Sequence, residues 1–245
     1  MSPIRRNLFV LLILSVGSAV RCGHAADAIA LFADMQFRRG FLLSYPDSSK
    51  GRAVETVLDL GDSNNVPAWR LCQWATKYSL ATVPCVRRDA GDLSYENEGK
   101  RVVVGGAGSP NRGLILDIRG RAEYGTKARK QGEGWPHLLI EQDASQFYPL
   151  NELDAVNFAI TLRLLHCENH TPSAEYDPGL HAAQFQMFFI IKNIASPRPI
   201  GTITSGLACR SSTVDTMSLQ PTWPKTRARA MRQASSSTLS MPGCW

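Results

Sequence analysis

The sequence has few of the residues that mark common catalytic centres and metal sites. Its 245 residues include five histidines and six cysteines, and no two cysteines have the CxxC spacing of a zinc or thiol-redox site. It contains no GxSxG nucleophile elbow, no P-loop and no HExxH helix. These absences exclude the enzyme classes that those motifs define. We therefore expect no cofactor, with a structural calcium ion as the one alternative.

Long hydrophobic runs are also scarce, and the longest lies at the N-terminus. Arg5 and Arg6 precede an apolar run from Leu8 to Val20, and both Gly23-His24-Ala25 and Ala26-Asp27-Ala28 fit a small-x-small cleavage site. The run is too short for a membrane-spanning helix. The sequence predicts a signal peptide over residues 1–25, a secreted or periplasmic protein, and no membrane contact after cleavage. An uncleaved N-terminal anchor is the alternative.

The central part of the chain lacks an excess of basic charge. The formal net charge is +6, but residues 194–245 hold six basic residues and one acid, and residues 1–25 hold three arginines. Residues 26–193 hold 18 basic and 20 acidic residues. A nucleic-acid-binding domain needs a basic surface of its own. We therefore expect no nucleic-acid partner.

Two small features each leave two interpretations open. Cys72 and Cys85 either form a disulfide in an oxidising compartment, worth about 2–3 kcal/mol for a short loop, or remain two unpaired thiols. Asp59, Asp62 and Asn64 either bind calcium through their oxygens or form a solvated turn.

Short apolar or alternating runs, separated by turns such as "GDSNNVP" and "GGAGSPNRG", predict an all-β domain over residues 26–193. In "NFAITLRLL", Phe158, Ile160, Leu162 and Leu164 fall on one face of a half-buried strand. We expect an antiparallel β-sandwich of jelly-roll or concanavalin-like type, incomplete at its C-terminus. Little helix is expected: residues 26–38 and one turn at "NELDAV". The expected strands are Val54–Leu60, Trp69–Thr76, Leu93–Asn97, Arg101–Val104, Leu114–Arg121, His137–Gln142, Asn157–His166 and Gln184–Lys192.

The last 52 residues, 194–245, differ in composition from the domain before them. Sixteen are Ser or Thr, and Trp223 and Trp245 are the only aromatic residues. Such a segment is typical of a disordered basic tail. Alternatively the tail is out of frame, because codons for "TSGLACRSSTVDTMS" exist that encode "FWFGLPFFDSRYDV" when shifted by one base. Sequencing the coding DNA across codons 190–210 distinguishes these two interpretations. An inserted or deleted base supports the shifted frame, and an intact frame contradicts it.

Polar residues recur at alternate positions on three of the expected strands. Arg119, Arg121 and Glu123 share one face beside Asp117, His137 and Glu141 share another, and Gln184 and Gln186 a third. Together, three such faces would form the floor of an open cleft that binds sugars. In such a cleft Arg binds carboxylate or sulfate groups, and Gln or Glu binds hydroxyls. The alternative is that these faces are simply the solvated side of a sheet.

The segments "RGRAEYGTKARKQGEGWPHLLIEQD" and "HAAQFQMFFIIKN" resemble secreted bacterial β-sandwich proteins. Their architecture is similar to that of concanavalin-like lectins, glucanases and jelly-roll polysaccharide lyases. The resemblance covers roughly residues 40–193. It implies a polysaccharide or oligosaccharide ligand, with Arg119, Arg121, Glu123, Gln184 and Gln186 as the binding residues.

The resemblance also implies candidate catalytic residues. Arg121-Ala122-Glu123 is similar to the Arg-x-Glu-x-Arg strand of alginate-type lyases, although Gly125 replaces the second Arg, and Gln184-Phe185-Gln186 lacks the usual His. His137 and His181 are then the candidate bases. Glu141 and Asp143 match part of a glucanase motif whose third position is Gln146 here. We therefore expect an exported carbohydrate-binding protein, with a non-catalytic structural or protein-interaction domain as the alternative.

Overall fold

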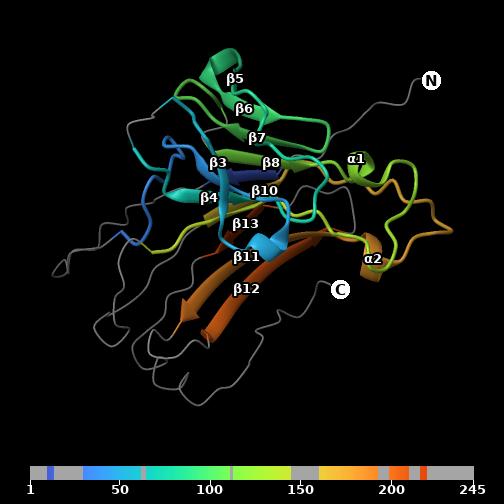
Figure 1. Ribbon diagram of the computed structural model, residues 1–245. Coiled ribbons are helices and arrows are strands. Elements are labelled where there is room, and N and C mark those ends of the chain that lie inside the picture. The colour runs from blue at the N-terminus through green and yellow to red at the C-terminus, as the bar shows by residue number, and fades with distance from the viewer. Residues whose placement is uncertain are drawn as a thin grey trace.

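The computed structural model describes residues 10–13, 30–61, 65–110, 113–144, 160–192, 199–209 and 216–219. These ranges form thirteen strands, two short helices and two 3-10 turns (Figure 1). The strands are β1 (Val10–Ile13), β2 (Phe41–Ser44), β3 (Val54–Leu58), β4 (Trp69–Cys72), β5 (Val86–Arg87), β6 (Leu93–Glu96), β7 (Lys100–Val104), β8 (Leu114–Ile118), β9 (Leu139–Glu141), β10 (Ile160–Leu164), β11 (Ala183–Lys192), β12 (Pro199–Cys209) and β13 (Thr216–Leu219). The helices are α1 (Gly120–Tyr124) and α2 (Pro178–His181), and the 3-10 turns cover Ser48–Lys50 and Asp89–Gly91.

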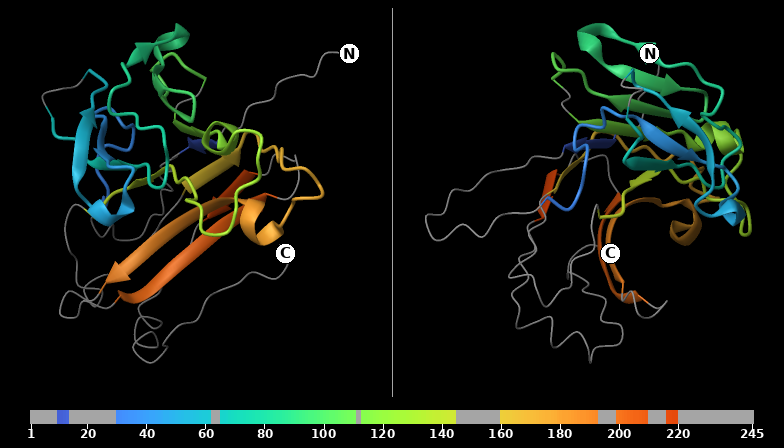
Figure 2. Two further views of the ribbon diagram at one scale, coloured as in Figure 1. Left: turned by 45° about the vertical axis from the view of Figure 1, so that its right-hand side comes forward. Right: turned by 60° about the vertical axis from the view of Figure 1, so that its left-hand side comes forward.

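The strands form three sheets. A seven-stranded antiparallel sheet has the order β13-β10-β1-β8-β7-β6-β5, and a four-stranded sheet has the order β3-β2-β4-β9, in which β2 and β4 run parallel. Among the described strands, β11 and β12 pair only with each other and form a long ribbon (Figure 2). The described chain is therefore all-β with little helix, as the sequence pattern predicts.

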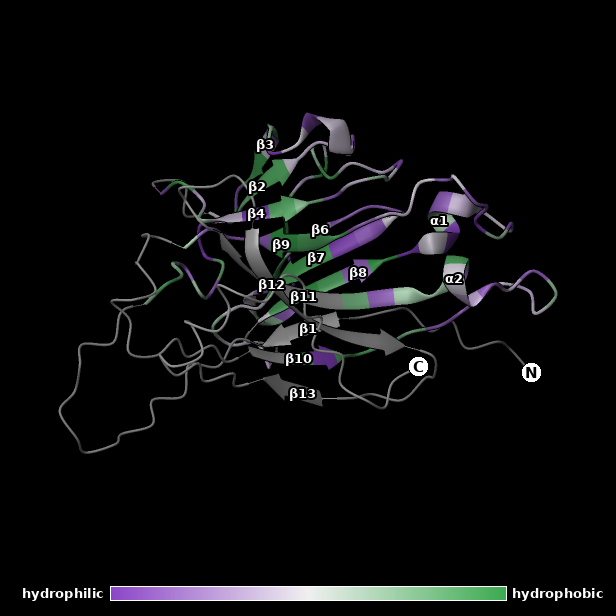
Figure 3. Ribbon diagram, turned by 90° about the horizontal axis from the view of Figure 1, so that it is seen from below, coloured by the Kyte–Doolittle hydropathy of each residue, from purple (hydrophilic) through white to green (hydrophobic). Residues whose placement is uncertain are grey.

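The seven-stranded and four-stranded sheets share one hydrophobic core. Alternate residues of a strand point to the same face, and Val102 and Val104 of β7 lie on the inner face with Leu114 of β8. They belong to one buried cluster with Phe41 and Leu71 from β2 and β4. Hydrophobic residues gather on β2, β8 and the second half of β7, whereas α1 is largely hydrophilic (Figure 3). The two sheets are thus joined through side chains that the period-two pattern places inside.

Each of the eight strands expected from the sequence overlaps an observed strand. Six observed strands are shorter than expected, and β7 and β11 begin one residue earlier than expected. The largest difference is at β8, which ends at Ile118, so that residues 120–124 form helix α1 instead of continuing the strand. Gly125, with φ +68°, ends this helix by donating its N–H to the Arg121 carbonyl. The shared strand face of Arg119, Arg121 and Glu123 is therefore wrong.

The short helix expected over residues 26–38 is also wrong where the structure describes it. Residues 31–37 form bends and turns. The Asp34 carboxylate accepts hydrogen bonds from the backbone N–H groups of Arg38 and Arg39, at 2.8 and 3.0 Å, which holds a turn in place of a helix. The turn expected at "NELDAV" lies outside the described residues.

Strands β12 and β13 lie in the segment 194–245, for which we expected disorder or a shifted frame. Strand β12 pairs with β11 from Ala183 opposite Cys209 to Lys192 opposite Pro199, and β13 pairs with β10. The reading frame is a property of the DNA. The domain boundary at residue 193 and the frameshift therefore stay predictions.

Gly40 occupies a position that only glycine fits, directly before β2. Its φ is +76°, and a Cβ atom added there would lie 2.0 Å from the Leu58 carbonyl oxygen. We expect Gly40→Ala to separate β2 from β3 and to lower the free energy of unfolding by about 2–4 kcal/mol. Urea denaturation measures this change. Gly51→Ala is the matched control, because Gly51 also has a positive φ but nothing lies within 4 Å of its added Cβ. An equal loss of unfolding free energy in both variants would contradict the expectation.

Candidate functional site

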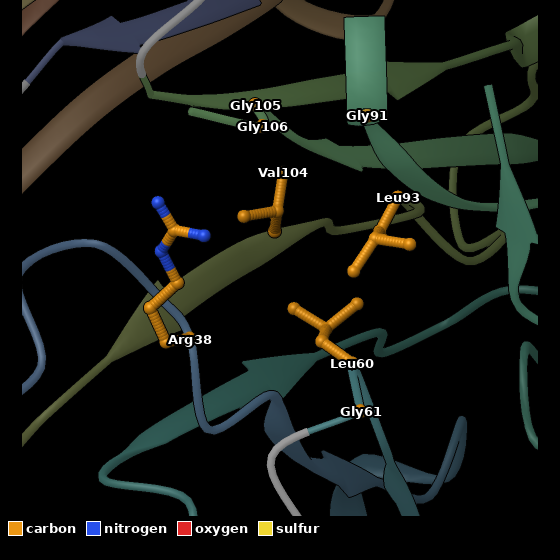
Figure 4. A pocket seen from close by; sticks show the side chains of 8 residues that line it. All are labelled: Arg38, Leu60, Gly61, Gly91, Leu93, Val104, Gly105 and Gly106. Atoms are coloured by element: carbon orange, nitrogen blue, oxygen red, sulfur yellow. The ribbon is translucent and has the colours of Figure 1, made fainter. Parts of the chain in front are cut away.

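A pocket of about 270 Å³ opens between strand ends of the two larger sheets (Figure 4). Leu93 and Val104 come from β6 and β7, while Leu60 follows β3, and these three side chains form an apolar floor. Arg38 is the only charged residue among the described lining residues. The glycines of the rim are Gly61, Gly91, Gly105 and Gly106. The pocket therefore combines one fixed positive charge with an apolar surface.

The turn before β2 holds Arg38 at this opening. Phe37 is 1% exposed and packs against Phe41 and Trp69, with ring centroids 5.9 and 5.2 Å apart. The Trp69 indole N–H donates to the Asp34 carbonyl at 2.9 Å. The Arg38 side chain is exposed, and its Nε donates to Gln36 at 3.3 Å. The two terminal nitrogens of the guanidinium have no partner among the described residues and remain able to bind a ligand.

The glycine rim allows close backbone contacts at the pocket. A Cβ atom on Gly106 would lie 2.5 Å from the Gly91 carbonyl oxygen, so the β7–β8 loop approaches the Asp89–Gly91 turn more closely than a side chain would permit. The Gly106 N–H donates to the Asp92 carboxylate at 2.9 Å, which fixes this loop. This part of the rim is thus formed by two backbone segments, the β7–β8 loop and the Asp89–Gly91 turn, which are held against each other.

A network of ion pairs crosses strands β6, β7 and β8 and includes two residues singled out in the sequence. Arg119 binds both Glu96 and Asp117, the latter at 3.2 Å, and Arg101 lies 3.6 Å from Asp117. Asp117 is fully buried, and burial raises the pKa of its carboxyl although Arg119 and Arg101 lower it. Arg88 closes the other end with a 2.6 Å contact to Glu96. Arg119 is therefore engaged with the protein's own carboxylates.

Glu123 also has a structural role. It is 3% exposed, and its carboxylate accepts hydrogen bonds from the Thr76 hydroxyl and, at 2.8 Å, from the Lys77 N–H. These contacts tie α1 to the segment that follows β4. Arg121, in the same helix, is exposed to solvent. Of the three residues expected to share a strand face, only Arg121 points to a position open to a large ligand.

The candidate catalytic residues lie in different surroundings. His137 is exposed beside Trp74, with ring centroids 6.2 Å apart. Glu141 lies 3.2 Å from Arg70 and 3.6 Å from Arg52, so its charge is already paired. His181 accepts the Asp177 N–H at Nδ1 and donates Nε2–H to the Arg129 carbonyl, both at 2.8 Å. Both nitrogens of that ring are therefore used within the protein.

The three strands expected to floor one cleft belong to three different sheets. Strand β8 lies in the seven-stranded sheet, β9 in the four-stranded sheet and β11 in the ribbon. Gln184 is exposed on β11, and Gln186 follows at the position opposite Gly206. No continuous floor joins these strands. Arg38 is a pocket residue that the sequence pattern does not predict, since its only local signal is its place between two aromatic residues in "FRRGF".

A buried lysine is the other unusual polar group. Lys100 lies on the core face of β7, is fully buried, and its Nζ has no hydrogen-bond partner among the described residues. Burial lowers the pKa of Lys100 to about 8, although the charges of Glu123 and Glu55 oppose this shift. The position is closed to solvent. The lysine therefore bears on stability rather than on ligand binding.

The cysteines and the expected calcium ligands form no site in the described chain. Cys72 is buried in β4, Cys85 is exposed before β5, and both thiols are free. Burial raises the pKa of Cys72 to about 12. Asp62 and Asn64 lie outside the described residues, and the Asp59 carboxylate accepts the Gly61 N–H at 2.7 Å. Within the described ranges, no three His, Cys, Asp or Glu residues gather to hold a metal ion.

The chain matches no protein-family model, no curated protein and no solved structure. No helix in the described residues is long and apolar enough to cross a membrane.

Proposed function

We propose that this protein is an exported β-sandwich module that binds an acidic carbohydrate, and that the Arg38 pocket receives the acidic group. The observation that carries the proposal is the pocket itself, in which one arginine stands beside the apolar side chains of Leu60, Leu93 and Val104. An arginine guanidinium binds a carboxylate or sulfate by two parallel hydrogen bonds. The C–H face of a sugar ring would pack against the three aliphatic side chains.

The size of the pocket limits the ligand to about one sugar residue. Pockets for drug-sized ligands enclose about 300–1,000 Å³, and this one encloses about 270 Å³. Because the pocket is open to solvent, the remainder of a longer chain would extend over the surface. We therefore expect the terminal acidic residue of a polysaccharide or oligosaccharide to bind there.

The proposal is one of binding, because the described lining offers no acid or base for catalysis. Arg38 is the only titratable residue among the described lining residues, and a glycosidase or lyase needs a carboxylate, imidazole or phenol at the bond that it cleaves. The candidates His181 and Glu141 are already paired elsewhere.

Isothermal titration calorimetry with the full chain tests the ligand class. Oligosaccharides of glucuronate should bind, and the matching neutral glucose oligosaccharides should bind roughly 10- to 100-fold more weakly, because a charge-assisted hydrogen bond contributes about 1.5–3 kcal/mol. Equal binding of the acidic and neutral series would contradict the proposal. Absence of binding by either series would favour the alternative, a non-catalytic structural or protein-interaction domain.

A further inference from the structure

Strand β1 lies in the interior of the seven-stranded sheet, yet it belongs to the segment that the sequence predicts to be removed as a signal peptide. It pairs with β8 on one side and with β10 on the other. Val10 stands opposite Leu116 and Leu164, and Leu12 stands opposite Leu114 and Leu162. Removal of residues 1–25 would therefore take away a strand that is bonded along both of its edges.

The sheet would then have two unpaired edges, one on β8 and one on β10, separated by the width of the missing strand. The backbone groups of β8 and β10 that bond β1 would lose their partners, and unpaired edges readily pair with another chain. Leu114 and Leu164, now 0% and 6% exposed, would border the empty position. Burying these groups again requires a strand in the same place.

The two edges cannot simply rejoin. Both β8 and β10 run antiparallel to β1 and thus parallel to each other. To pair directly, they would have to approach by one strand spacing, about 4.8 Å. Strand β8 is held in the shared core through Leu114, so such a shift would disturb packing against the four-stranded sheet. Every other described strand already has its own partners.

We propose that the position between β8 and β10 is a strand-acceptor site, which takes an extended segment of another polypeptide once residues 1–25 have been removed. The incoming strand runs antiparallel to both neighbours, as in β-strand addition. It carries apolar residues at the two positions opposite Leu114 and Leu116, which lie on the core side. The position between them, opposite Ile115 and the exposed Arg163, accepts an apolar or an acidic residue.

The proposal rests on the export part of the proposed function and is independent of carbohydrate binding at Arg38. Its test uses the full chain with residues 23–28 replaced by a specific protease site, so that natural processing is not required. After cleavage, the released segment is removed in mild urea and the urea is dialysed away. A fluorescent peptide with the sequence of residues 7–16, flanked by lysines for solubility, is then added, and its anisotropy and the Tm of the protein are measured.

We expect saturable binding of one peptide per cleaved chain and a rise in Tm. The uncleaved chain should bind the peptide at least about tenfold more weakly, because its tethered segment competes at a high effective concentration. The same peptide with Leu12→Pro should also bind about tenfold more weakly, because proline removes a backbone donor from the strand and its ring disfavours a central position. If the cleaved chain unfolds when the segment leaves, the unsubstituted peptide should restore its near-ultraviolet circular dichroism.

Three results would overturn the proposal. They are equal binding to cleaved and uncleaved chains, equal binding of the proline peptide, and a Tm that does not change when the segment is removed. Saccharide titration of the uncleaved chain reports separately on the Arg38 pocket. Failure of the strand-acceptor site and failure of carbohydrate binding are therefore distinguishable.

Discussion

Replacing Arg38 by alanine should weaken the binding of an acidic oligosaccharide roughly 10- to 100-fold. The guanidinium is the only positive charge among the described lining residues, and its two terminal nitrogens have no partner within the described chain. Loss of a hydrogen bond to a charged group costs about 1.5–3 kcal/mol. The fold should be unaffected, because the Arg38 side chain is exposed and the turn is held by Asp34 and Phe37. Calorimetry of the variant measures the change.

Arg121→Ala is the matched control for Arg38→Ala. Arg121 is also exposed, and the sequence pattern places it among the carbohydrate-binding residues, whereas the structure places it in α1 and outside the pocket lining. We expect its substitution to leave affinity nearly unchanged. A large loss for Arg121→Ala together with no loss for Arg38→Ala would move the binding site to the region that the sequence favours and contradict the pocket.

Replacing Lys100 by methionine should stabilise the protein by up to about 3 kcal/mol at pH 7. A buried charge without a partner costs free energy, and an apolar side chain of similar length removes that cost. The magnitude follows from the pKa of Lys100, which burial lowers from 10.5 to about 8. Urea denaturation of both proteins at pH 7 measures the difference. Lys127→Met, at an exposed position, is the control and should change stability little.

The stabilisation by Lys100→Met should diminish as the pH rises. Below pH 8 the lysine is protonated in both the folded and the unfolded state, and the full cost of burying its charge is present. Between pH 8 and 10.5 the unfolded state binds more protons, so the wild-type protein becomes more stable relative to the variant. The difference in unfolding free energy should therefore be smaller at pH 10 than at pH 7. A variant less stable than wild type at pH 7 would contradict this interpretation.

The all-β class and most of the strand positions could be predicted because they depend on local alternation. In β10, Leu164 is buried and Arg163 is exposed, as the alternation in "NFAITLRLL" predicts. The same rule failed at residues 119–123, because the Glu123 carboxylate is drawn to Thr76 and Lys77, which are distant in the sequence. Long-range hydrogen bonds of this kind leave no local signal.

The pocket could not be predicted for a related reason. Its lining comes from four separate segments: the turn at Arg38, residues 60–61, residues 91–93 and residues 104–106. Each segment alone is typical of a loop or a strand end. The glycine-rich "GGAGSPNRG" indicates a β-hairpin loop, and it does connect β7 to β8, with the Gly105 N–H bonded to the Gly113 carbonyl. Only the packing of the two sheets brings this loop to Arg38.

The measurement that tests the carbohydrate-binding proposal most directly is an amide ¹H–¹⁵N NMR titration of the full chain with a glucuronate oligosaccharide. We expect the perturbed amides to lie at Arg38 and at the rim glycines Gly91, Gly105 and Gly106, with the neutral glucose oligosaccharide causing much smaller changes. Perturbations concentrated at residues 119–123 or at Gln184, or none at saturating ligand, would contradict the assignment of the binding site to the Arg38 pocket.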